Sequence, residues 1–273
     1  MFVFLNGKII DEKKAVVGIN DHGFLYGDGV YETLRTANGK IWQFSLHMER
    51  LRKSLRKMRI TYEPDEKFLH EKILELIKKN KLREARIRIT VTRGENKFVF
   101  DGAKNPTVLI TVCEPDKVDS KLIRKGVAVA TMKVKRVLPG AKSISLLPMI
   151  MGKQYAADKQ VYETVFVNEK SHVLEGTVTN IFIIKKGFVY TPGREVLNGT
   201  TRNFIVRLAR KNGYKVKIGV VTKRFLKNAD EIFITNAPKG IIPVVEVDGV
   251  QIGKPGIITK ELIEIFNEHI ANN

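Results

Sequence analysis

The chain has 273 residues, of which 43% are hydrophobic and 8% aromatic, enough for two soluble domains with buried cores. Its net charge of +19 is spread along the whole length, without zinc-finger spacing, an aromatic RNP-like strand or a basic tail, so we expect neither a nucleic-acid partner nor a metal site. No apolar run is long enough to span a bilayer, which predicts a protein without a membrane segment.

The first part of the chain, residues 1–114, begins with predicted strands. An Asn6-Gly7 pair between two short apolar runs predicts a β-hairpin. Residues 29–36 and 40–44 predict two further strands around an Asn-Gly turn. These four runs indicate a sheet that starts at the N-terminus.

Two helices and two strands complete this first part. Ser45 is the expected N-cap of one helix, and a second helix is expected over residues 65–80, with Phe68 on its buried face. The runs "ARIRITVTR" and "PTVLITVCE" predict the last two strands. Together with the first strands they predict an α+β domain over residues 1–114.

The chain contains a single cysteine, Cys113, in the last of these strands. One cysteine excludes an intrachain disulfide and fits a reducing, cytoplasmic location. We expect Cys113 to be a small buried hydrophobe rather than a nucleophile.

Residues 115–126 are polar and broken, and they predict an interdomain linker. The second domain, over residues 127–273, is rich in apolar strand-like runs. Helices are expected at about residues 147–160, 201–213 and 256–270. This arrangement predicts a barrel-like or strongly curved mixed sheet with helices outside it.

The first chemical clue is Lys142, which follows a Pro-Gly break and precedes the apolar run "ISLLPMI". Apolar surroundings lower the pKa of a lysine and leave it as a free amine, which makes it a candidate for a Schiff base with a carbonyl compound. The alternative is an ordinary lysine whose ammonium reaches water. A second lysine, Lys153, lies in the helix predicted after it.

Three further motifs carry groups that suit a phosphorylated pyridine. Glu175, in "LEGTVTNIF", is a carboxylate that could pair with a pyridine nitrogen, or an ordinary turn residue. Thr200 and Thr201 open a predicted helix after a glycine, where free N–H groups can hold a phosphate or simply be capped. Arg50, in "HMERL", is either a fork for phosphate or one more surface arginine.

Taken in this order, the motifs resemble those of the class IV aminotransferases, fold-type IV enzymes that use pyridoxal 5′-phosphate. The resemblance covers nearly the whole chain, and its motifs are "YGDGVYETLR", "HMERL", "AKSISLLPMIMGKQYA", "LEGTVTNIF", "LNGTTR" and "ADEIFITN". It implies a two-domain fold with a small α/β first domain and a larger cofactor-binding second domain. It also implies a homodimer whose active site lies between the domains and is partly closed by the partner chain.

The resemblance also implies a role for each motif residue. Lys142 becomes the lysine that binds the cofactor aldehyde and moves the Cα proton, and Glu175 becomes the partner of the pyridine nitrogen. The phosphate ligands implied are Arg50, Thr200, Thr201 and, more loosely, the backbone of Asn236 and Ala237. The reaction implied is the transfer of an amino group between an amino acid and a 2-oxo acid.

The substrate is less well indicated, because the chain departs from both well-known patterns. Branched-chain enzymes usually carry a tyrosine where this chain has Leu147, and a Tyr-x-Arg strand where it has Arg86-Ile87-Arg88. The well-known D-amino-acid enzymes carry an Arg-x-His pair where this chain has Phe98 and Phe100.

The substrate residues expected are therefore Arg88, Lys239 and Tyr31, with the two cations holding carboxylate groups. Arg88 could equally lie on the outer face of its strand, beside polar neighbours. A D-amino acid such as D-alanine or D-glutamate is the first choice of substrate. The alternatives are a branched-chain L-amino acid aminotransferase, an aminodeoxychorismate lyase, and a basic protein that kept the fold without the chemistry.

Overall fold

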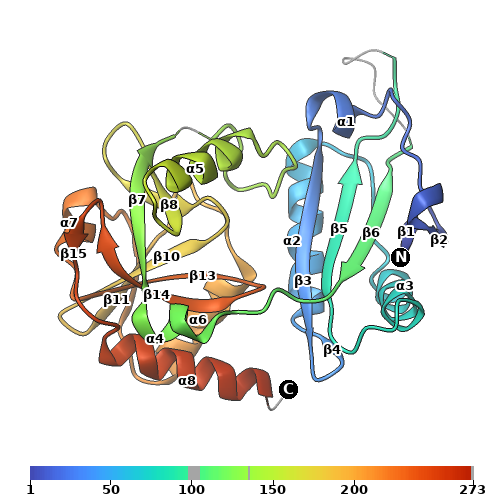
Figure 1. Cartoon of the computed structure of the whole chain (residues 1–273). Coiled ribbons are helices and arrows are strands. Elements are labelled where there is room, and N and C mark those ends of the chain that lie inside the picture. The colour runs from blue at the N-terminus through green and yellow to red at the C-terminus, as the bar shows by residue number, and fades with distance from the viewer. Residues whose placement is uncertain (98–104, 135, 272–273) are drawn as a thin grey trace. The chain divides into compact units, whose positions relative to one another are not determined.

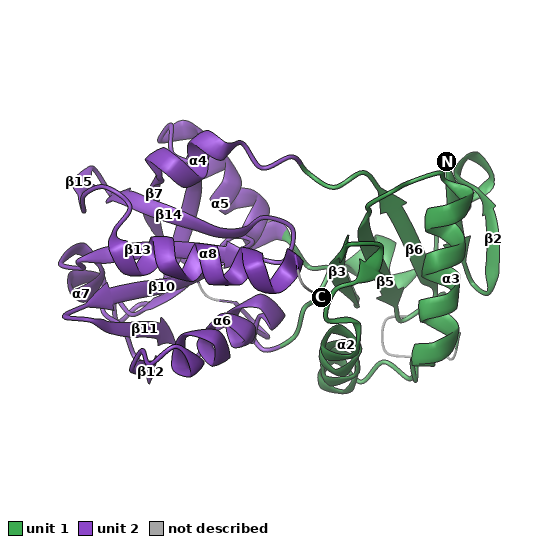
Figure 2. Ribbon diagram, turned by 90° about the horizontal axis from the view of Figure 1, so that it is seen from below, with its two compact units in different colours: residues 1–116, 141–146 green, residues 117–140, 147–273 purple. Residues whose placement is uncertain are grey.

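The computed structural model describes residues 1–97, 105–134 and 136–271. The chain forms two compact units, shown in two colours in Figure 2. Unit 1 consists of residues 1–116 and 141–146, and unit 2 of residues 117–140 and 147–273. Residues 141–146, which the sequence analysis assigned to the second domain, thus fold with the first.

Unit 1 contains an antiparallel sheet with the strand order β2-β1-β6-β5-β3-β4. Its strands are β1 (Phe2–Leu5), β2 (Lys8–Asp11), β3 (Gly29–Ala37), β4 (Lys40–Ile41), β5 (Arg86–Thr92) and β6 (Val108–Cys113) (Figure 1). The predicted hairpin at Asn6-Gly7 is confirmed, with φ of 46° and 91° at the two residues. Positive φ at both central positions is what a tight hairpin turn with right-handed strand twist requires.

The helices of unit 1 are α1 (His22–Tyr26), α2 (Phe44–Met58) and α3 (Glu66–Lys79), with a 3-10 turn, η1, over Glu12–Lys14. The predicted second helix is confirmed, and Asp65 caps it by accepting a hydrogen bond from the N–H of Phe68. The prediction of Ser45 as the N-cap of α2 was wrong. Gln43, with φ of 53°, turns the chain so that α2 begins at Phe44, and the predicted strand over residues 40–44 is shortened to β4.

One face of this sheet forms the core of unit 1 with α2 and α3. Ile87, Ile89 and Val91 of β5 are fully buried, while Arg88 and Thr90 between them point to the opposite face. The core side chains from the helices are Met48, Leu51, Leu55, Leu69, Ile73, Leu76 and Ile77. Phe68 is 38% exposed and lies at the rim beside Phe4, so its predicted burial was wrong.

Unit 2 contains a mixed sheet with the order β12-β11-β10-β13-β14-β7-β8-β9, and β15 pairs with β14. Its strands are β7 (Val127–Lys133), β8 (Glu163–Val167), β9 (Val173–Gly176), β10 (Asn180–Lys185), β11 (Phe188–Pro192), β12 (Val216–Gly219), β13 (Glu231–Asn236), β14 (Gly240–Val247) and β15 (Val250–Gln251). The two ends of this order approach each other, because the N–H of Val173 in β9 donates to the carbonyl of Val221, just after β12. The predicted barrel-like mixed sheet is confirmed.

The helices of unit 2 are α4 (Ser120–Lys125), α5 (Leu147–Asp158), α6 (Thr200–Lys211), α7 (Lys223–Lys227) and α8 (Ile257–Ala271). The three helices predicted for this part of the chain are confirmed as α5, α6 and α8, and the α+β fold class is confirmed with them. Residues 115–126, predicted as a linker, contain α4, which packs against β14. The aromatic centre of unit 2 includes Phe182 and Phe233, whose rings stack with centroids 4.7 Å apart.

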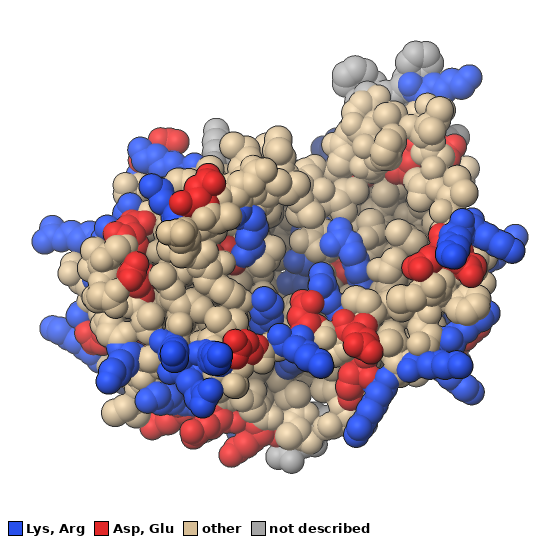
Figure 3. Space-filling view, viewed as in Figure 1, with Lys and Arg blue, Asp and Glu red and all other residues tan. Residues whose placement is uncertain are grey.

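The surface carries its positive charge dispersed rather than in one patch. In Figure 3, lysine and arginine side chains are scattered over the visible faces of both units, with acidic side chains among them. None of the described helices combines the length and apolar character that crossing a membrane would require. Cys113 is exposed, so its predicted burial was wrong; it is the last residue of β6.

We expect the replacement of Asp65 by alanine to lower the free energy of unfolding by about 1 kcal/mol, because the first turn of α3 loses its cap. Chemical denaturation measures this change. Ser45→Ala is the matched control and should leave the free energy of unfolding unchanged, since Ser45 lies inside α2 and caps nothing. A loss at Ser45 equal to that at Asp65 would contradict the assignment of the two caps.

Candidate functional site

Lys142 lies on a short segment that extends the sheet of unit 1 at the edge of β3. The N–H of Tyr31 donates to the carbonyl of Lys142 over 2.9 Å, and the N–H of Ile144 donates to the carbonyl of Gly29 over 3.0 Å. On its other side, the N–H of Lys142 donates to Oγ of Ser54 in α2 over 3.1 Å. The backbone of Lys142 is therefore fixed by both a strand and a helix.

The side chain of Lys142 meets an aromatic ring. Its Nζ lies 4.5 Å from the centroid of Tyr31, and the guanidinium carbon of Arg88 lies 4.1 Å from the same centroid. Since Arg88 contacts Tyr31, it points away from the core face of β5, on the face that carries Tyr31. Among the expected site residues, the structure thus brings Lys142, Tyr31 and Arg88 together in unit 1.

The desolvation expected from the apolar run after Lys142 is not observed. Leu147, Ile150 and Met151 are exposed. The reason is that the buried residues of α5 are Gly152 and Ala156, on the side where the helix packs against β8 and β7. Lys142 itself is half-buried, and the ring of Tyr31 supplies the apolar contact to its ammonium.

Arg50 lies on the inner face of α2, which excludes the surface-arginine alternative. Its Nε and Nη2 donate to the two carboxylate oxygens of Glu32 over 2.7 and 2.6 Å. Nδ1 of His47 lies 2.7 Å from the same carboxylate, and both Glu32 and His47 are fully buried. The sequence analysis missed Glu32 and His47, which hold Arg50 in place.

Opposing effects set the ionisation of this group. Burial raises the pKa of Glu32, but the charge of Arg50 and the hydrogen bonds from Arg50 and His47 outweigh it and bring the pKa down to about 2. Burial lowers the pKa of His47 from 6.5, against the effect of Glu32. Near neutral pH, Glu32 is therefore ionised and His47 is neutral, with its Nδ1–H donating to the carboxylate.

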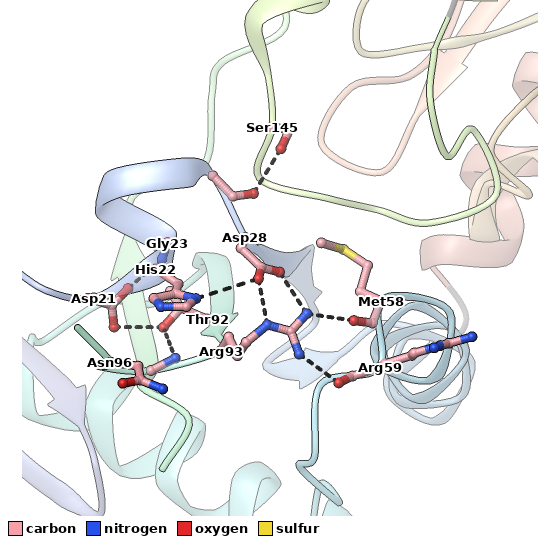
Figure 4. Close-up of polar contacts among 12 residues, drawn as sticks. Asp21, His22, Gly23, Asp28, Met58, Arg59, Thr92, Arg93, Asn96 and Ser145 are labelled. Carbon is pink, nitrogen blue, oxygen red and sulfur yellow. Dashed lines mark hydrogen bonds and ion pairs between the residues drawn. The ribbon is translucent and has the colours of Figure 1, made fainter. Parts of the chain in front are cut away.

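A second polar cluster holds the end of the same sheet (Figure 4). Arg93, which follows β5, donates from Nε and Nη2 to the carboxylate of Asp28 over 2.5 and 3.1 Å. It also donates to the carbonyls of Met58 and Arg59 at the end of α2, each over 2.7 Å. Arg93 therefore joins the start of β3 to the C-terminus of α2.

Ser145 connects the lysine segment to this cluster, because its Oγ donates to the carbonyl of Gly27 over 2.8 Å. The segment is consequently tied to the stretch before β3 by a side chain, and to β3 itself by the backbone. The sequence analysis missed this scaffold around Lys142.

Glu175 is a buried carboxylate of β9 in unit 2, not an exposed turn residue. It is 4% exposed and accepts hydrogen bonds from the N–H of Leu197 over 3.0 Å and from Nδ2 of Asn180 over 3.2 Å. It also pairs with Arg136, which the sequence analysis missed. Three donors keep the carboxylate oriented, as a group that must hold a ring nitrogen requires.

The start of α6 lies close to Glu175 along the same network. Gly199 caps the helix without a side-chain hydrogen bond, and a Cβ there would meet Oδ1 of Asn180 at 2.1 Å, so a residue without a side chain is needed. Thr200 and Thr201 are both buried, and Oγ1 of Thr201 has no hydrogen-bond partner among the described residues. A buried, unpartnered hydroxyl at a helix N-terminus fits a bound phosphate.

The remaining expected residues of unit 2 lie at the end of β13 and beyond it. Asn236 ends β13, and its Oδ1 accepts from the N–H of Lys239 over 2.9 Å; Ala237 lies between them. Nζ of Lys239 donates to the hydroxyl of Tyr162 over 3.1 Å. Phe98 and Phe100, the two residues at the position of the Arg-x-His pair, lie outside the described residues.

Lys153 differs from Lys142 in its surroundings. Its Nζ lies 3.0 Å from the carboxylate of Glu163, which is fully buried on β8. Oγ1 of Thr177 donates to the same carboxylate over 2.5 Å. Lys153 therefore neutralises a buried acid, and the structure gives it a structural role.

The sequence from the start of β3 to the end of β14 matches a known family. Residues 29–247 match the amino-transferase class IV family. The chain belongs to the class IV aminotransferases. It is an enzyme that transfers amino groups, and its substrates are amino acids and 2-oxo acids.

Two relatives of this aminotransferase carry different substrate names. A putative branched-chain-amino-acid aminotransferase from Methanocaldococcus jannaschii is 36% identical over 98% of this chain and 96% of that protein. A D-alanine aminotransferase from Listeria monocytogenes is 32% identical over 99% of this chain and 96% of that protein. The family is therefore certain from sequence, and the substrate is not decided by it.

Solved structures agree with the fold. The branched-chain aminotransferase of Thermoproteus uzoniensis, solved with norvaline, has a TM-score of 0.93 at 25% identity over the whole of this chain and 95% of that chain. A bacterial-type branched-chain aminotransferase solved in complex with N-(5′-phosphopyridoxyl)-L-glutamate has a TM-score of 0.91 at 26% identity over 99% and 94% of the two chains. The predicted cofactor, pyridoxal 5′-phosphate, is confirmed for the family, and the buried acid and the open hydroxyl described above fit it.

We expect the free energy of unfolding to fall as the pH is lowered from about 5 to 2, because Glu32 must be protonated against its lowered pKa of about 2. A lowered carboxyl pKa contributes stability above the unfolded value, here 4.5, which is lost as the pH falls towards 2. The difference corresponds to roughly 3 kcal/mol. Urea unfolding at a series of pH values measures it.

Glu32→Gln should remove this part of the pH dependence and lower stability at pH 7. Glu63→Gln, at an exposed partner of Arg52, is the control and should leave the profile unchanged. Parallel profiles for the wild type and Glu32→Gln between pH 5 and 2 would contradict the ionised, buried carboxylate.

Proposed function

We propose that this aminotransferase acts on D-amino acids, with Lys142 as the residue that binds the cofactor aldehyde and moves the substrate proton. The observation that carries the catalytic assignment is the placement of Lys142. Its backbone is held by Tyr31 and Ser54, and its Nζ lies 4.5 Å from the ring centroid of Tyr31. Lys153, the nearest alternative in sequence, is already paired with a buried acid.

Each proposed residue contributes one physical function. When bound, pyridoxal 5′-phosphate supplies an aldehyde that accepts the amino group and a ring that takes up the electron pair released at Cα. The unprotonated Nζ of Lys142 takes the proton from Cα and returns it, and the ring of Tyr31 keeps water from that nitrogen. Glu175 holds a proton on the ring nitrogen through its buried carboxylate.

Binding of the phosphate is assigned to donors in both units. Arg50 contributes a guanidinium fixed by Glu32, and Thr200 and Thr201 contribute the start of α6. The backbone N–H groups of Asn236 and Ala237 are the remaining donors that we assign to the phosphate. The unpartnered Oγ1 of Thr201 supports this assignment.

Substrate binding is assigned to Arg88, Tyr31 and Lys239. Arg88 orients a carboxylate by its planar fork of N–H groups, and its contact with Tyr31 supports an inward position. The D-alanine aminotransferase of Bacillus licheniformis, 34% identical over 96% of this chain, supports a D-amino acid as substrate. The relative from Methanocaldococcus jannaschii and the solved structures favour a branched-chain L-amino acid, which is the second candidate.

We also propose a homodimer in the cytoplasm. Val16, Ile19 and Phe24 of unit 1 are each more than 70% exposed, and burial of such side chains by a second copy supports the dimer. A single, unpaired cysteine supports a reducing compartment.

The lysine assignment predicts a difference between two variants. Lys142→Ala should lose the visible absorbance of the protein-bound cofactor, because no other amine replaces the bond to the aldehyde. Lys153→Met is the matched control and should keep that absorbance, with lower stability because Glu163 loses its partner. Absorbance spectra of the purified proteins with added pyridoxal 5′-phosphate measure this; an unchanged band in Lys142→Ala would refute the assignment.

The substrate assignment predicts the outcome of single half-reactions. D-alanine and D-glutamate should convert the bound cofactor to its amine form, and L-leucine should not. Arg88→Ala should slow the D-glutamate reaction by about tenfold more than the D-alanine reaction, because a second carboxylate loses its partner. Stopped-flow absorbance measures these rates, and rapid conversion by L-leucine without any by D-amino acids would favour the branched-chain candidate.

A further inference from the structure

The buried carboxylate of Glu32 is out of pattern with the strand that carries it. In β3, Val30, Leu34 and Thr36 point to the core face, and Glu32 occupies the same face between Val30 and Leu34 with no exposed surface. A charged group in a core is costly unless it is fully paired, and an apolar residue at such a position is often at least as stable. The charge at residue 32 therefore calls for a role besides stability.

The partners of Glu32 come from one stripe of α2. His47, Arg50 and Ser54 recur at helical spacing, so they face β3 together. His47 and Arg50 both donate to Glu32, and Ser54 accepts from the backbone of Lys142. The buried acid is thus located between Arg50 and the strand that anchors the lysine segment.

The contact between Glu32 and Arg50 fixes an orientation. Nε and Nη2 form one edge of the planar guanidinium, and both bond to the carboxylate of Glu32. Holding one edge of a rigid plane sets the direction of its remaining N–H groups. His47 in turn holds the carboxylate from a third direction, over 2.7 Å.

We propose that Glu32 is a positioning residue, held by His47, that aims the guanidinium of Arg50 at the phosphate of the cofactor. The inference rests on the proposed function, in which Arg50 binds that phosphate. Glu32 contributes orientation and not attraction, because its negative charge cancels that of Arg50. The two effects have opposite signs, which makes the proposal testable.

The experiment compares pyridoxal 5′-phosphate with pyridoxal, which lacks the phosphate. Dissociation constants of both are measured on the cofactor-free protein for the wild type, Glu32→Gln, Arg50→Lys and the double variant. The readout is the phosphate preference, defined as the constant for pyridoxal divided by that for pyridoxal 5′-phosphate, which a general loss of stability does not change. Glu32→Gln should weaken pyridoxal 5′-phosphate on the order of tenfold and leave pyridoxal unchanged.

The double variant isolates the route of the effect. In the Arg50→Lys background, Glu32→Gln should not change the phosphate preference further, because its effect passes through Arg50. His47→Ala keeps the bond between Glu32 and Arg50 and should lower the phosphate preference less than Glu32→Gln. It also provides the test if Glu32→Gln does not fold, which circular dichroism reports, and Glu63→Gln is the control at an exposed acid.

The outcomes separate this inference from the proposed function. An unchanged phosphate preference in Arg50→Lys would overturn the phosphate role of Arg50 and this inference with it. A lowered preference in Arg50→Lys, with an unchanged or higher preference in Glu32→Gln, would overturn the inference alone. If Glu32→Gln does not fold, an unchanged preference in His47→Ala overturns it.

Discussion

The site in unit 1 depends on the pairing of residues 142–144 with the edge of β3. Two backbone hydrogen bonds, from Tyr31 to Lys142 and from Ile144 to Gly29, set the register of this pairing. Because side chains alternate along a strand, the same register directs Tyr31 to the face where the ammonium of Lys142 lies. A shift by one residue would turn Lys142 away from the ring.

The alternation in β3 also divides two tasks between its faces. Tyr31 contacts Lys142 and Arg88 on one face, while Glu32 holds Arg50 on the other. One strand therefore orders both the reactive amine and the guanidinium assigned to the phosphate. The core below, formed with α2 and α3, makes this strand rigid.

The sequence was sufficient for the residues that occur in local motifs, and insufficient for their partners. Lys142, Glu175 and the start of α6 stand next to glycines and apolar runs that identify them. The contacts of Glu32 with Arg50 and of Glu175 with Arg136 join residues 18 and 39 positions apart, which spacing alone does not reveal. The pattern Val-x-Glu-x-Leu in β3 was an available signal, because it places a carboxylate on the inward side of the strand.

The central claim is that Lys142 is the residue bound to the cofactor, and reduction of the cofactor-loaded protein with borohydride tests it most directly. Reduction converts the bond between lysine and cofactor into a stable one, and mass spectrometry of the peptides then identifies the modified residue. The account predicts the added phosphopyridoxyl mass on the peptide that contains Lys142. That mass on Lys153 or on any other lysine, with Lys142 unmodified, would contradict it.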